Sequence, residues 1–170
     1  TNQGELEILG GSGTGTGHAA TVTSTGVQQI TVAGGPSTSP NPNADPNAVL
    51  ILGGSSNGSA ASLTTTTDGA TQTITADTGD VTVEGGSASG ANALIQSAAL
   101  NNGPVLAQQI TVTDGNLRVI GGSGSATASI AATNTGAAEQ AVNVSGTITV
   151  QGGGGTAADA SIKSAGFNTT

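Results

Sequence analysis

The chain has 170 residues, enough for one domain, and it combines 29 Gly with 1% aromatic and 7% charged residues. Its net charge is −8, and it has only two basic residues. Nucleic-acid binding requires clustered Lys and Arg, so this composition excludes a nucleic-acid binder. No run approaches the roughly 20 apolar residues of a membrane-spanning helix, so we expect no membrane insertion. Disorder or a stacked solenoid fits this composition, and only the solenoid requires apolar residues in strict phase.

An internal repeat begins with a short strand that ends at a pair of glycines. The second and fourth residues before each pair are aliphatic, as Leu6 and Ile8 are in the first copy. This period of two predicts a strand with one face inward. Six residues before the pair stands Gly or Asn, where we expect a turn with left-handed backbone. The pairs are Gly10 and Gly11, Gly53 and Gly54, Gly85 and Gly86, Gly121 and Gly122, and Gly152 and Gly153.

Two further strands follow each pair. About ten residues after the pair comes Ala-x-aliphatic, beginning at Ala20 in the first copy, which predicts a second strand with a small inward residue. A third segment reads Gln-x-aliphatic-x-small apolar. Its glutamines share the inward parity and are Gln28, Gln72, Gln108 and Gln140. Each copy therefore predicts three short strands separated by turns.

These copies predict one all-β domain over residues 1–170, a parallel solenoid of about five coils. A three-strand repeat cannot bury its apolar face alone, whereas coils stacked about 4.8 Å apart can. We expect a right-handed coil, because crossover connections favour that hand. Extra length falls in turns, at the Pro- and Asn-rich insertion 36–48 and around 101–106.

The glutamine column is the most specific polar feature. Stacked amides can hydrogen-bond along such a column, so we interpret it as an internal ladder at a corner. A polar binding track is the less favoured alternative. The Gly pairs resemble a phosphate-binding loop only superficially, since the Lys-Ser/Thr that should follow is missing. We interpret them as turns.

Residues for catalysis or for a metal are scarce. His18 is the only histidine, and the acids are scattered through the copies. We therefore expect no enzyme activity, no catalytic residue, no cofactor and no metal site, although Asp77, Asp80 and Glu84, or Asp114, could bind a cation weakly. Ice binding by the Thr-rich stretch 64–67 is disfavoured, because the outward residues of the first strand are irregular.

Two segments carry a resemblance to a known group. Residues 108–124 (Gln-Gln-Ile-Thr-Val-Thr-Asp-Gly-Asn-Leu-Arg-Val-Ile-Gly-Gly-Ser-Gly) and residues 145–153 resemble repeats of filamentous-haemagglutinin-type bacterial surface proteins. The likeness is one of repeat style and covers nearly the whole chain. It implies a secreted, right-handed β-helix at the cell surface or outside the cell, used in adhesion, biofilm or fibre formation. It carries over no site residues.

The two ends of the sequence are in phase with each other. The chain begins at the turn before a first strand and stops inside a third strand, so placing Thr1 after Thr170 restores the length of 140–146. We therefore predict a structural subunit of an extracellular filament whose partner is another copy, stacked head to tail. The alternative is an adhesin stalk that binds a receptor or glycan through 36–48. The end residues are Thr1, Asn2, Gln3, Gly4, Phe167, Asn168, Thr169 and Thr170.

Overall fold

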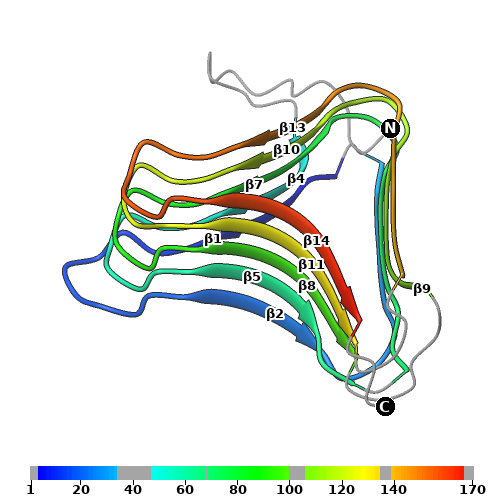
Figure 1. The fold of residues 1–170 in the computed structure, drawn as a ribbon, viewed down its shortest axis with the longest axis horizontal. Helices are drawn as coiled ribbons and strands as arrows, with labels where there is room; N and C mark the ends of the chain where they lie inside the picture. Colours follow the sequence, from blue (N-terminus) through cyan, green and yellow to red (C-terminus); the bar gives the residue numbers. More distant parts are fainter. Residues whose placement is uncertain (1–3, 34–46, 68, 100–105, 135–138, 167–170) are drawn as a thin grey trace.

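A computed structural model describes residues 4–33, 47–67, 69–99, 106–134 and 139–166. These residues contain only strands, turns and irregular segments, without a helix, and so without a helix that could cross a membrane. The strands form three parallel sheets around a triangular section (Figure 1). The predicted all-β fold, a parallel solenoid with three strands per coil, is confirmed.

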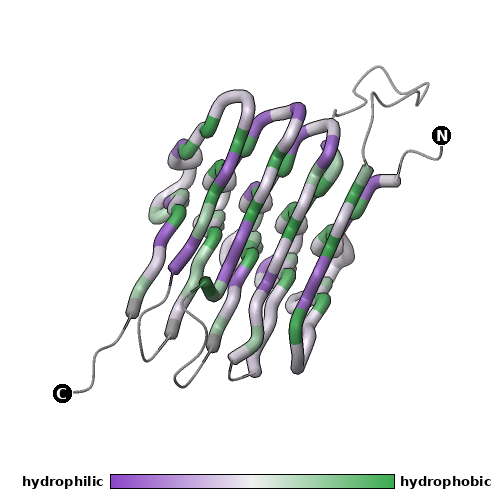
Figure 2. The backbone as a smooth tube through the Cα atoms, turned by 90° about the vertical axis from the view of Figure 1, so that its right-hand side faces the viewer, coloured by the Kyte–Doolittle hydropathy of each residue, from purple (hydrophilic) through white to green (hydrophobic). Residues whose placement is uncertain are grey.

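Each sheet collects one strand from successive coils, and the last coil has no described strand in sheet C. Sheet A holds β1 (Leu6–Leu9), β4 (Asn47–Leu52), β7 (Asp80–Glu84), β10 (Leu117–Ile120) and β13 (Ile148–Gln151). Sheet B holds β2 (Ala20–Ser24), β5 (Ala61–Thr65), β8 (Ala93–Ala99), β11 (Ala128–Asn134) and β14 (Ala160–Gly166). Sheet C holds β3 (Gln28–Val32), β6 (Gln72–Ala76), β9 (Leu106–Val112) and β12 (Glu139–Val144). The strands therefore recur as parallel rows, which Figure 2 shows side by side.

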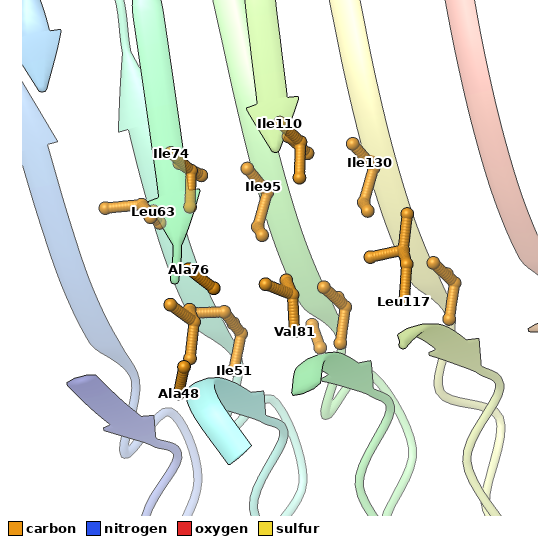
Figure 3. Packing of buried hydrophobic residues seen from close by; sticks show 14 of the residues in the cluster. Ala48, Ile51, Leu63, Ile74, Ala76, Val81, Ile95, Ile110, Leu117 and Ile130 are labelled. Atoms are coloured by element: carbon orange, nitrogen blue, oxygen red, sulfur yellow. The ribbon is translucent and has the colours of Figure 1, made fainter. Parts of the chain in front are cut away.

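The pairing register places equivalent residues of the repeat directly above one another. In sheet A, Leu6 pairs with Val49, Val49 with Val81, Val81 with Leu117 and Leu117 with Ile148. Because alternate side chains face inward, these columns meet the inward columns of the other two sheets (Figure 3). The resulting core is a continuous stack of Val, Ile, Leu and Ala. Because the stacked coils share this core, few large side chains are enough to form it.

The expected number of about five coils needs correction. About three coils, β4–β6, β7–β9 and β10–β12, have a neighbour on each side in sheets A and B. We call these the inner coils. The first coil, β1–β3, lies at one end, and the last coil comprises only β13 and β14 among the described residues. The handedness of the coil stays a prediction.

The glycines of the repeat are required mainly by close contact between coils. This reason differs from the expected one, a left-handed backbone at a turn. Of the glycines six residues before a pair, Gly79 has a positive φ of 96°, whereas Gly115 and Gly146 are not among the positive-φ residues. A Cβ on Gly53 would lie 2.5 Å from the backbone nitrogen of Gly86. Such distances are too short for any side chain. Stacking at the strand spacing therefore selects glycine here.

Candidate functional site

The glutamine column forms a hydrogen-bonded ladder along the inside of sheet C. Gln72 Nε2 donates to Gln28 Oε1 at 2.7 Å, and Gln108 Nε2 donates to Gln72 Oε1 at 2.7 Å. Gln140 Nε2 donates to Gln108 Oε1. Gln72 and Gln108 are fully buried, Gln28 is nearly so, and Gln140 is half-buried. The structure therefore brings all four predicted glutamines together inside the coil, away from any surface track.

Backbone carbonyls fix the direction of this ladder. Gln72 Nε2 also donates to the Leu63 carbonyl at 3.3 Å, and Gln108 Nε2 to the Ala131 carbonyl at 3.2 Å. A carbonyl oxygen only accepts hydrogen bonds, so turning either amide over would place oxygen against oxygen. Every rung consequently points the same way, with the nitrogen of the later coil toward the oxygen of the earlier coil.

The two end faces expose side chains that the inner coils bury. Ile148 and Val150 of β13 are each 48% exposed, although their partners Leu117 and Val119 in β10 are 0% exposed. At the opposite end, Val22 of β2 is 43% exposed, whereas its partner Leu63 is 0% exposed. The strands at these faces also lack a paired neighbour on one side among the described residues. Each end thus combines open strand edges with inward apolar side chains.

A shallow groove of about 610 Å³ follows the glycine pairs along the solenoid. It is lined by the last outward residue of each sheet A strand, by the glycine pairs and by the serines after them. Glu84 is the one ionisable residue in the lining of this groove. The outward residues in question are Leu9, Leu52, Glu84, Ile120 and Gln151. No His, Lys or Arg and no second acid joins Glu84 in this lining.

Hydrogen bonds from the glycine pairs close the base of the loop that connects sheets A and B. The second glycine of each pair donates its amide back across the loop, as Gly54 does to the Ser59 carbonyl at 2.7 Å and Gly86 to the Ala91 carbonyl at 2.7 Å. The first glycine continues the ladder of sheet A, as Gly53 does toward the Glu84 carbonyl at 2.9 Å. The predicted turn glycines are therefore placed at the contact between coils.

The acids considered for cation binding have other contacts or lie apart. Asp80 Oδ1 accepts from the Asn116 backbone at 2.8 Å and from Asn116 Nδ2 at 3.0 Å. Asn116 Oδ1 in turn accepts from the Thr147 backbone at 2.9 Å. Over the described ranges, no group of three His, Asp or Glu side chains gathers around one point. His18 is exposed in the loop before β2.

Sequence reasoning missed this second polar ladder. Asp80, Asn116 and Thr147 occupy one position in successive coils, where Asp80 is the first residue of β7 and the other two directly precede β10 and β13. The signal was an Asp or Asn directly after the turn glycine in Gly79-Asp80 and Gly115-Asn116. Asp and Asn side chains readily bond neighbouring backbone, so this pattern could have indicated a bond between coils.

Several predicted residues lie outside the described part of the chain. They are Thr1, Asn2, Gln3, Phe167, Asn168, Thr169 and Thr170, whereas Gly4 is described and exposed. Residues 36–46 of the expected insertion are also outside it, and β4 begins at Asn47. Comparisons of the chain with protein-family models, curated proteins and solved structures gave no match. The end faces and the glutamine ladder are the features of the molecule that bear on its function.

Proposed function

We propose that this chain is a structural subunit of an extracellular bacterial fibre, built by stacking solenoids end to end. The observation that carries the proposal is the contrast in burial within single columns. Leu117 and Val119 are 0% exposed, and the equivalent Ile148 and Val150 one coil later are 48% exposed. One more coil on that face would cover both side chains and pair the open strand edges.

The free energy of such stacking comes from two sources. Fully burying a Val or Ile side chain contributes about 1.5–3 kcal/mol, so covering these half-exposed residues contributes on the order of 1 kcal/mol each. Pairing a strand edge also supplies partners to backbone N–H and C=O groups that would otherwise face water. Because each end face carries strands of two or three sheets, these small terms add up over a whole coil.

The opposite end face offers side chains of matching kind. The first coil carries Leu6 and Ile8 on the inward side of sheet A, where Ile8 is already buried, and Ala20 and Val22 in sheet B, where Val22 is exposed. These residues occupy the same columns as Ile148, Val150, Ala160 and Ile162 at the other end. A second copy of the chain can therefore continue each column with residues of the type already in it. Contacts between two different faces generate an open filament and not a closed dimer.

The fibre would belong with secreted surface proteins in the style of filamentous haemagglutinin, placed outside the cell or on its surface. Its role would be attachment or biofilm structure and not catalysis. This setting rests on the resemblance of residues 108–124 and 145–153 and on the weakly charged, glycine-rich composition. An adhesin stalk that binds a glycan through 36–48 would use the same solenoid with its end faces covered by further coils of one chain.

Electron microscopy of the purified chain and two variants tests the proposal. Val150→Asp places a charge on the exposed end face, whereas Thr149→Asp changes the neighbouring outward position, beside Arg118 of β10. We expect filaments from the unchanged chain and from Thr149→Asp, and particles of monomer size from Val150→Asp. Circular dichroism checks that both variants remain β-structured. If the unchanged chain stays monomeric at high concentration, the filament proposal is wrong. If Val150→Asp still forms filaments, the β13 face is not the contact between subunits.

A further inference from the structure

His18 differs from the residues that stand at its position in the other coils. It lies at the end of the loop between β1 and β2, where its carbonyl accepts the Gly11 amide at 2.8 Å. The carbonyls of Ser59, Ala91 and Ala126 accept the corresponding glycine amides in the next three coils. Those three residues are 0% exposed, whereas His18 is exposed. Inside the solenoid this position is therefore enclosed and holds only a small side chain.

The imidazole of His18 lies against the first-coil loop, on the side away from the second coil. A Cβ on Gly13 would lie 3.1 Å from His18 Nε2. The Gly13 carbonyl faces the second coil, since it accepts a hydrogen bond from Ser56 Oγ. At the same loop position, three residues after the first glycine of the pair, a Cβ on Gly124 would lie 2.6 Å from the Ser87 carbonyl oxygen of the preceding coil. His18 thus occupies the place that a preceding coil would take.

The same corner of the last-coil face is open. A Cβ on Gly121 would lie 2.5 Å from the Gly153 backbone nitrogen of the following coil. A Cβ on Gly152, at the same position in the last coil, would meet its nearest atom, the Ala158 carbonyl oxygen, at 3.7 Å. The two end faces are therefore unequal at the corner between sheets A and B. A further coil fits directly on the last coil, whereas the first coil must first move His18.

We propose that His18 is a displaceable cap that restrains stacking of a second copy on the first-coil face. The inference rests on the proposed function and adds its regulation. The segment that displaces His18 is the glycine-pair loop of another copy's last coil, because β13 and β14 of that copy would continue sheets A and B directly onto β1 and β2. Repeat proteins need caps to keep their end faces from further association. A cap made of one side chain leaves the face available once the imidazole turns outward.

Replacing His18 with serine, the residue of the second coil, removes the cap and keeps the loop. We expect His18→Ser to lower the concentration at which filaments form by about threefold to tenfold, because no ordered side chain has to be displaced. Gln29→Ser is the matched control, since it shortens an exposed polar side chain of the first coil on the outward side of β3. It should leave that concentration unchanged. Sedimentation over a concentration series measures all three chains, and circular dichroism checks that each is β-structured.

A double variant tests which surface the uncovered face binds. Val150→Asp places a charge on the last-coil face, so His18→Ser combined with Val150→Asp should stay at the monomer mass of 15.9 kDa. Dimers or filaments of the double variant would mean that uncovered first-coil faces bind one another. That result would overturn the last-coil loop as the segment that displaces His18.

The outcomes for the single variant distinguish the cap from the fibre. If His18→Ser needs the same concentration as the unchanged chain, or a higher one, His18 is not a cap, although the fibre stands. If neither chain forms filaments at any concentration, the proposed fibre itself fails. Filaments from His18→Ser alone would support both, with the unchanged chain held in its capped form.

Discussion

The inner and terminal coils contain the same kinds of residue in the same register, yet their surroundings differ. Val81 and Val83 of an inner coil are 0% exposed, while Ile148 and Val150 of the last coil are half-exposed. Gly121 has no room for a Cβ, while a Cβ on Gly152, one coil later, would meet its nearest atom at 3.7 Å. In a solenoid, the coil above and the coil below therefore determine how much a residue contributes, since each repeat contacts only its neighbours.

The largest expected effect is on the core of an inner coil. Ile130 is 0% exposed between Ile95 and Ile162, so Ile130→Ala should lower the free energy of unfolding by about 2–5 kcal/mol. Ile162→Ala, in the same column of the last coil, should cost on the order of 1 kcal/mol, because that site is only partly buried. Urea unfolding below the polymerising concentration measures both. Equal losses would contradict the contrast between inner and terminal coils.

A glycine substitution should show the same contrast through steric overlap. In Gly121→Ala the new methyl group would lie 2.5 Å from the Gly153 backbone nitrogen, so the coils must separate, at a cost of about 3 kcal/mol. Gly152→Ala should change the stability of the monomer by less than about 0.5 kcal/mol. Thermal unfolding followed by circular dichroism compares the pair. Gly152→Ala should nevertheless block polymerisation, and filaments from it would argue against a coil seated on that face.

A smaller effect is expected within the glutamine ladder. Gln72→Leu removes the rungs to Gln28 and Gln108 and leaves their buried amides short of partners, at a cost of about 1–3 kcal/mol. Gln140→Leu removes one rung at a half-buried position and should cost less than half as much. Denaturant titration of both variants measures the difference. A neutral Gln72→Leu would mean that the ladder adds little stability.

The smallest effect should come from the outer surface of an inner coil. Arg118 is exposed on sheet A between Thr82 and Thr149, and Arg118→Ala should change stability by less than about 0.5 kcal/mol. The same unfolding assay applies. A loss comparable to that of Ile130→Ala would show that the sensitivity of inner coils is not confined to their inward side.

The sequence predicted the strands well because their signals are local. Alternation around Val81 and Val83, or around Leu117 and Val119, fixes which side faces inward, and the glycine pairs set the register between copies. The inward position of Gln72 and Gln108 followed from the same parity. These features repeat in several copies, so chance agreement is small.

Other features depend on contacts between coils, which a single repeat does not show. The glycine pairs were interpreted as turns, whereas the backbone of the neighbouring coil is what excludes a side chain at Gly53 and Gly121. Asp80 was considered as a cation ligand, but its carboxylate bonds Asn116 of the next coil. The number of enclosed coils, about three and not five, likewise depends on which strands have neighbours.

The most direct test of end-to-end stacking is X-ray fibre diffraction from aligned, concentrated chain. Strands that run across a solenoid give a spacing of about 4.8 Å along its axis. Stacking predicts long filaments with a sharp reflection at that spacing parallel to the filament axis, lost in Val150→Asp and kept in Thr149→Asp. Material that remains monomeric at 15.9 kDa, or filaments whose 4.8 Å reflection lies perpendicular to their axis, would contradict it.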